Sequence, residues 1–364
     1  MLRRAKLYSL RAARALGFSS AVMHSRWRQN RLLIIGWHGV SIDDEHQWDP
    51  SLYMPPSHLR RRLELIAQAG CNVLPLDTAV ALLSRGELPP RAVALTVDDG
   101  AFDFYQLAFP LFQQFGFPVT LYLTTYYVQF NRPVYDVMAS YLLWKGRGRV
   151  LCWPEVLDAA PVELCGPALA ETSKRLRQYA SDKGLSGAEK DIVLCRLAER
   201  LELDYAGILQ RRILQLMSVS EAREMAKKGV DLQLHTHRHG VSLDQALFER
   251  ELADNRAWLE RIRTGQPAHF CYPGGVCRAE FLPWLREAGI LSAATCKAGL
   301  AERHTDPLLL PRLMDTSFFT EEEFAGWLSG IAACLPARPY VEAESQFLEK
   351  RLGKARTIAA GASR

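Results

Sequence analysis

The feature that most limits the fold of this chain is a regular alternation of short apolar runs with helix-like segments. Between the runs, apolar residues recur at the spacing of amphipathic helices, as in residues 58–70, which end on Gly70, a typical helix C-cap. Strands that alternate with helices predict parallel β/α units, and seven or eight such units predict a barrel. The predicted strands are residues 32–37, 72–76, 92–97, 119–125, 230–235, 269–273 and 291–295.

Residues 137–229 break this alternation, because they contain much helical sequence and no predicted strand. We therefore predict a barrel built from residues 32–136 and 230–315, interrupted by a helical insertion over residues 137–229. The insertion is expected to form a cap or side subdomain with a structural or substrate-shaping role. Residues 1–31 are predicted to form a basic amphipathic segment, and residues 316–364 C-terminal helices and a tail.

The N-terminal segment is strongly basic, and its first acidic residue is Asp43. Leu2, Leu7, Leu10 and Ala13 fall at helical spacing among the basic residues, which predicts an amphipathic helix. Two interpretations stay open: a first helix packed on the domain, or peripheral contact with a membrane surface. The basic residues are Arg3, Arg4, Lys6, Arg11, Arg14, Arg26, Arg28 and Arg31.

Composition excludes some classes of protein. A formal net charge of +5 over 364 residues does not indicate a nucleic-acid-binding protein. No apolar stretch is long enough to span a bilayer, and the N-terminus lacks the apolar core of a secretory signal. The eight cysteines form no CxxC pair, which favours free thiols in a reducing compartment. We expect a cytoplasmic protein, with the inner face of the membrane as an alternative location.

Polar motifs follow three of the predicted strands. TVDDG (96–100) places two adjacent carboxylates at a strand end, where parallel barrels carry their active sites. HTHRH (235–239) places two histidines four residues apart, so that both can reach one metal ion. Two histidines and one carboxylate, with an open position for water, form a common catalytic zinc site. CYPGG (271–275) is a turn that can present backbone N–H groups to an oxyanion.

In this order, TVDDG, HTHRH and CYPGG resemble the signature motifs of the polysaccharide deacetylases of carbohydrate esterase family 4, which contain the NodB homology domain. Residues 37–40 (WHGV) and 310–313 (LPRL) are similar to the opening and closing motifs of that family. The resemblance covers roughly residues 32–315 and implies a distorted (β/α)7 barrel. It also implies metal-dependent hydrolysis of the N-acetyl group of an amino sugar in a glycan.

By position, the resemblance implies that Asp98 is the general base and that Asp99, His235 and His239 hold the metal. Gly274 matches the residue whose backbone N–H helps to hold the oxyanion. The two histidines and the carboxylate suit zinc, cobalt or nickel more than calcium or magnesium, so we expect a divalent metal, with zinc favoured.

Two positions depart from the family pattern. Many members have an arginine, which holds the base, where this chain has Cys271. Many also have a Leu-x-His motif with the general acid where this chain reads Leu310-Pro311-Arg312. His38 and His304 are the candidates for the acid. We expect Arg312 to take over the task of the missing arginine, because its planar fork can hold a carboxylate in two hydrogen bonds.

The leading hypothesis is therefore a polysaccharide N-deacetylase whose partner is an N-acetylated glycan, an exopolysaccharide precursor or a lipid-linked oligosaccharide. Two alternatives stay open. One is a deformylase or amidase that acts on a lipid-linked sugar or a small molecule. The other is a metal-binding barrel that has lost catalysis together with the family's acid and arginine.

Overall fold

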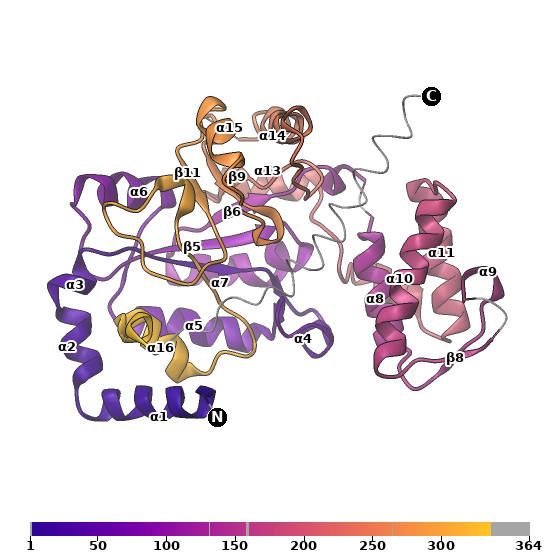
Figure 1. Cartoon of the computed structure of the whole chain (residues 1–364), viewed down its shortest axis with the longest axis horizontal. Coiled ribbons are helices and arrows are strands. Elements are labelled where there is room, and N and C mark those ends of the chain that lie inside the picture. Colours follow the sequence, from indigo (N-terminus) through magenta and orange to yellow (C-terminus); the bar gives the residue numbers. More distant parts are fainter. Residues whose placement is uncertain (1, 131, 158–159, 264, 336–364) are drawn as a thin grey trace.

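The computed structural model describes residues 2–130, 132–157, 160–263 and 265–335. A parallel sheet in the order β11-β10-β9-β6-β5-β1-β12 lies at its centre (Figure 1). The short strand β4 (Asn72–Val73) pairs with β5 outside this order. The strands of the ordered sheet are β1 (Leu33–Trp37), β5 (Ala92–Asp99), β6 (Thr120–Leu123), β9 (Asp231–Leu234), β10 (His269–Cys271), β11 (Ser292–Ala294) and β12 (Leu313–Met314).

The segment 310–314 closes the two edges of this sheet into a ring. At its start, the N–H of Leu310 donates to the Ala293 carbonyl at 3.0 Å, and the Leu310 carbonyl accepts from Thr295 N–H at 2.9 Å. At its end, Leu313 is in register with Ile35 of β1. One segment thus links β11 to β1, which confirms the predicted distorted (β/α)7 barrel.

Successive side chains of each strand point to opposite faces, and the two faces pack into different clusters. Leu33 and Ile35 of β1 belong to the large core, whereas Ile34 belongs to a smaller cluster that includes Tyr122 and Cys271. In β5, Ala94 belongs to the same small cluster. Because side chains alternate along β5, Thr96 and Asp98 point to the same face as Ala94, which is the inner face of the ring.

Helices cover the outer face of the ring (Figure 1). Gly70 follows α5 with φ 59°, the left-handed conformation expected of a C-capping glycine. The large core lies between these helices and the strands. These helices are α5 (Pro56–Gln68), α7 (Phe109–Phe115), α13 (Val219–Lys227), α14 (Gln245–Leu259), α15 (Phe281–Glu287) and α16 (Glu321–Ser329). The helix α6 (Leu76–Arg85) instead packs with the smaller cluster.

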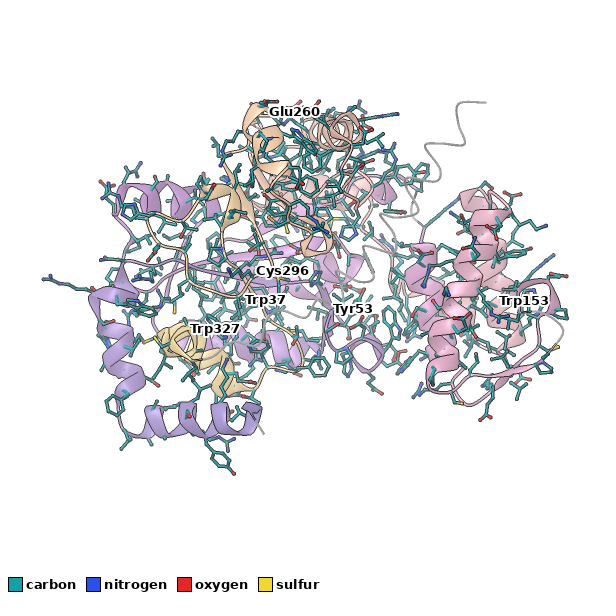
Figure 2. All side chains as sticks on the ribbon, in the orientation of Figure 1. Trp37, Tyr53, Trp153, Glu260, Cys296 and Trp327 are labelled. Carbon is teal, nitrogen blue, oxygen red and sulfur yellow. The ribbon has the colours of Figure 1, made fainter. Side chains whose placement is uncertain are left out.

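A helical body stands to one side of the barrel (Figures 1 and 2) and has its own hydrophobic core, which includes Trp153. The sequence predicts no strand here, but β7 (Val150–Leu151) and β8 (Val162–Glu163) form a short antiparallel pair. This part of the prediction is wrong, because two-residue strands carry no readable alternation. The helices are α8 (Tyr135–Lys145), α9 (Pro154–Leu157), α10 (Pro167–Asp182), α11 (Gly187–Arg200) and α12 (Tyr205–Gln210).

The loop after β1 connects the barrel to this body. It contains β2 (Gly39–Val40), α4 (Glu45–Trp48) and β3 (Tyr53–Met54). The Asp44 carboxylate in this loop accepts hydrogen bonds from Lys145 Nζ at 2.7 Å and from the Tyr141 hydroxyl at 2.5 Å, both on α8. The Trp48 ring also meets the Tyr141 ring edge-on.

Three helices precede the barrel: α1 (Leu2–Ala15), α2 (Phe18–His24) and α3 (Arg26–Gln29). α1 packs on α16 through Leu10, which is buried, and Arg11 pairs with Glu322 at 2.9 Å. No helix within the described ranges combines the length and the apolar character that spanning a membrane requires. Of the predicted C-terminal helices and tail, residues 336–364 lie outside the described residues.

Candidate active site

The predicted site residues gather at the carboxyl ends of the parallel strands. Asp98 and Asp99 end β5, His38 follows β1, His235 follows β9 and Cys271 ends β10. These strands are parallel neighbours or near neighbours in the ring, so their carboxyl ends meet at one rim. This rim is where barrels of parallel strands carry their chemistry.

Asp99, His235 and His239 converge on one point. The Asp99 Oδ1 atom lies 3.1 Å from His235 Nε2 and 3.2 Å from His239 Nε2. Ligands bound at zinc–nitrogen and zinc–oxygen distances in a tetrahedron are about 3.3 Å apart, so the spacing fits a metal of this kind. His235 Nδ1 lies 2.9 Å from the Cys271 carbonyl, which fixes the proton on Nδ1 and leaves Nε2 for a metal.

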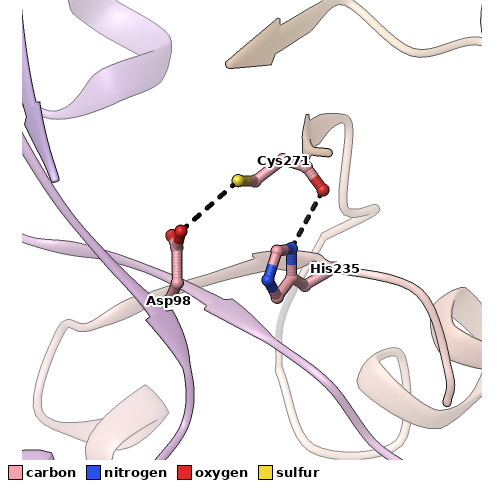
Figure 3. Close-up of side chains that lie close together, drawn as sticks. All are labelled: Asp98, His235 and Cys271. Atoms are coloured by element: carbon pink, nitrogen blue, oxygen red, sulfur yellow. Dashed lines mark hydrogen bonds between the residues drawn. The ribbon is translucent and has the colours of Figure 1, made fainter. Parts of the chain in front are cut away.

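A second group of potential ligands, Asp98, His235 and Cys271, lies beside the first (Figure 3). Two observations make it the weaker metal site. Both oxygens of Asp98 already accept hydrogen bonds from Arg312. Burial raises the pKa of the Cys271 thiol well above its usual range, so the thiolate that zinc requires is disfavoured. The donors of Asp99, His235 and His239 are therefore the better metal site.

The backbone around this group adopts an unusual conformation. Asp99, Thr236 and His239 have φ values of 70°, 59° and 53°, in the left-handed region that residues with a side chain seldom adopt. Such conformations persist where the surrounding structure enforces them, and they concentrate at functional sites. Here they turn one carboxylate and two imidazoles toward a common centre.

His237 points away from that centre. Its ring is buried, and its Nδ1 lies 2.8 Å from the Thr125 hydroxyl. The backbone carbonyl of His237 accepts hydrogen bonds from Tyr126 N–H and from the Thr124 hydroxyl. His237 therefore joins the end of β9 to the loop after β6, and it is the matched control for the two other histidines of the motif.

Arg312 lies against Asp98 inside the ring. Its Nη1 and Nη2 atoms donate to the two carboxylate oxygens at 2.6 and 2.7 Å, and both side chains are buried. Burial alone would raise the pKa of Asp98, but the charge and hydrogen bonds of Arg312 outweigh it, so the pKa is lowered. The carboxylate is thereby kept ionised in a fixed orientation, the task that position 271 leaves open when it is a cysteine.

The small side chain at position 271 makes room for this arrangement. Arg312 Nη2 donates to Cys271 Sγ at 3.0 Å, so the thiol contacts the guanidinium directly. Arg312 Nη1 also lies 3.3 Å from the Thr96 hydroxyl, on the inner face of β5. An arginine at position 271 would occupy the same space, so Arg312 and Cys271 are complementary choices.

A small cavity of about 10 Å³ lies next to Asp98. This is close to the volume that one water molecule requires. His38 lines it, with Nε2 at 3.7 Å from Asp98 Oδ2, and so does Gly274, whose φ of 58° brings the turn after β10 over the site. The other lining residues are His235, Tyr272, Gly275 and Cys296.

The structure places the other acid candidate elsewhere. His304 is exposed, in a loop whose Ala301 pairs with Leu32 at the amino end of β1. His38 follows the carboxyl end of the same strand. Of the two candidates, only His38 lies at the site.

Asn255 is a site residue that none of the sequence motifs indicates. It lies on α14 and is fully buried, and its side-chain oxygen accepts a hydrogen bond from His235 N–H at 2.9 Å. Its Nδ2 donates to the Leu123 carbonyl and to the Thr125 hydroxyl, both at 3.0 Å. One side chain thus holds the ends of β6 and β9 together behind His235. No motif surrounds Asn255, and only its polar character on an apolar helix face could have indicated it.

Replacing Asn255 by alanine is expected to weaken metal binding by about 10- to 100-fold, the usual effect of losing a group that orients a ligand. The dissociation constant is measured by competition with a chelator. Leu252→Ala is the control, because Leu252 is buried on the same helix and contributes only packing. Equal metal affinity in the two variants would contradict the role of Asn255.

Comparisons with known proteins agree with this geometry. The family model described as polysaccharide deacetylase matches residues 206–293, which include His235, His239 and Gly274. No curated protein matches the sequence. Among solved structures, the deacetylase PplD of Streptococcus pyogenes in complex with acetate is similar at 15% identity with a TM-score of 0.54, over 85% of this chain and all of that one (100%).

Two further structures share the fold. IcaB from Ammonifex degensii is similar at 16% identity with a TM-score of 0.51, over 83% of this chain and 99% of that one. A polysaccharide deacetylase from Bacillus cereus is similar at 14% identity with a TM-score of 0.51, over 82% of this chain and 69% of that one. Residues 206–293 thus match the polysaccharide deacetylase model, and the solved structures show that the chain shares the fold of these deacetylases.

Proposed function

We propose that the protein is a metal-dependent hydrolase that removes the N-acetyl group from an amino sugar of a glycan or glycan precursor. The observation that carries the proposal is the convergence of His235 and His239 on Asp99, which lies within hydrogen-bond distance of both, beside a carboxylate that Arg312 keeps ionised. The substrate would be an N-acetylated polysaccharide or a lipid-linked oligosaccharide.

The residues present suit hydrolysis of an acetamide. Asp99, His235 and His239 would hold a divalent metal, with zinc favoured, and the bound metal supplies polarisation of the acetamide carbonyl and a water of lowered pKa. Asp98 accepts a proton as the water oxygen bonds to the carbonyl carbon. The N–H of Gly274 faces the developing oxyanion. His38 gives a proton to the amine nitrogen as the C–N bond breaks, which releases acetate and the free amino sugar.

The function is tested with purified protein, zinc and chitooligosaccharides, by measuring released acetate and the metal content of the protein. Acetate release that depends on the metal supports the proposal. Release of formate from an N-formylated sugar, without acetate from the acetylated one, would favour the deformylase. Bound metal without release from any glycan or amide would favour the catalytically inactive barrel.

Arg312 acts on this reaction through Asp98, so we treat it as a positioning residue. Arg312→Lys and Arg312→Met should each lower kcat by about 10- to 100-fold with unchanged metal content, because a lysine cannot reproduce the bidentate pair. Adding Cys271→Arg to Arg312→Met should restore part of the activity, since position 271 lies within reach of Asp98.

The double variant separates positioning from general stability. A merely destabilised Arg312→Met protein would gain nothing from a second buried substitution. If Cys271→Arg with Arg312→Met is no more active than Arg312→Met alone, although both are folded, the proposed role of Arg312 is wrong.

A further inference from the structure

The first two helices expose large apolar side chains. Tyr8 and Leu16, on α1 and directly after it, are 70% and 72% exposed, and Phe18, the first residue of α2, is 58% exposed. α2 contains no buried residue. α2 packs on α16, and its Met23 is partly buried against the large core. Tyr8, Leu16 and Phe18 stay outside this packing and are available for a further apolar contact.

α1 is apolar on two opposite sides. Leu10 is buried against α16, while Tyr8, Ala12 and Ala15 are exposed. At 100° per residue, these three side chains lie about 140° to 200° around the helix from Leu10. A surface helix usually presents a polar face to solvent, so the second apolar side marks a contact surface. We call Tyr8, Ala12, Ala15, Leu16 and Phe18 the outer arm face.

The charge of the arm identifies what covers this face. Residues 1–31 contain eight Lys or Arg residues, and no acidic residue precedes Asp43. Arg28 is buried and donates to the Leu328 and Arg31 carbonyls, so it anchors the arm to the barrel. Arg14 on α1 and Arg26 on α3 are exposed on the arm. A second copy of the chain would bring an equally basic arm and be repelled, whereas an anionic bilayer offers both negative charge and an apolar interior.

We propose that the outer arm face lies on the surface of an anionic lipid bilayer. α3 leads directly into the amino end of β1, whereas the candidate active site is at the carboxyl ends of the strands. Figure 1 likewise shows α1, α2 and α3 on the side away from the helical body of α8, α10 and α11. Attachment through the arm therefore leaves the catalytic rim open to a glycan.

The test uses the full-length chain, with Leu16→Glu and Phe18→Glu combined in one variant. Both side chains are largely exposed, so the change should not affect folding. Co-sedimentation is measured with vesicles of phosphatidylcholine alone and of phosphatidylcholine with phosphatidylglycerol, at low and high salt. The unmodified protein should bind only the anionic vesicles and dissociate at high salt. The double variant should bind them at least 10-fold more weakly.

The control is a second double variant that adds the same two negative charges outside the arm. Ile192→Glu with Leu291→Glu changes two apolar side chains that are 54% and 63% exposed, outside the arm, and should bind like the unmodified protein. Equal binding of the two double variants would overturn the proposal, as would a lipid-free dimer that the arm variant converts to a monomer. Acetate release from soluble chitooligosaccharides should be the same in all three proteins, so a failure of the proposed function is recognised separately.

Discussion

Replacing either His235 or His239 by alanine is expected to remove the bound metal and to lower acetate release by at least about 10³-fold. In the proposed site each imidazole would supply one of three ligands, and two remaining donors do not hold a catalytic metal at the open coordination that hydrolysis needs. Metal content is measured by elemental analysis of the purified variants, and activity at saturating added zinc.

His237→Ala is the matched control, because it removes an imidazole of the same motif that bonds to Thr125 instead of facing the ligand centre. It should retain one metal ion per chain, although the loss of a buried hydrogen bond should lower its stability. Loss of the metal in His237→Ala, with retention in His235→Ala or His239→Ala, would show that another set of donors holds the ion.

Asp98→Asn is expected to lower kcat by about 10²- to 10⁴-fold while the metal stays bound, which is the range for removal of a general base. The amide keeps the size of the carboxylate but cannot accept the proton. Its NH₂ group would also face the Arg312 guanidinium, so one of the two hydrogen bonds of the pair is lost.

Asp99→Asn provides the comparison at the adjacent position. It should lose metal affinity as well as activity, because Asp99 is the carboxylate that lies between the two histidines. The separation of roles would be refuted by an Asp98→Asn enzyme with near-normal turnover, or by loss of the metal from that variant alone.

Much of this arrangement could be predicted from sequence because it is local. Apolar runs identify β1, β5, β6 and β9, and the polar residues directly after them must lie at one rim once the strands are parallel. The position of Arg312 beside Asp98 also follows from topology, since the last strand of a closed ring returns to the first. The sequence does not define the hydrogen-bond geometry of that pair.

Other features depend on contacts between distant segments. Asn255 is one of many polar residues on helical sequence, and only the packing of α14 behind β6 and β9 makes it important. Residues 72–76 are predicted to form a barrel strand, but only Asn72 and Val73 pair with β5, at its first two residues. From Thr96 onward, β6 is the strand that pairs with β5. The strands β7 and β8 are too short to produce a pattern.

The segment 310–314 lies near the end of the chain, so the contacts that it makes with Asp98 form late in synthesis. Its backbone bonds to β11 and β1, and its Arg312 holds Asp98, which was made more than two hundred residues earlier. A growing chain therefore lacks the Asp98–Arg312 pair until this stretch has left the ribosome and docked. Incomplete chains that end before residue 310 would contain Asp99, His235 and His239 but not the Arg312 that orients Asp98. Under the proposed mechanism, the protein would therefore become active only when nearly all of its fold is complete.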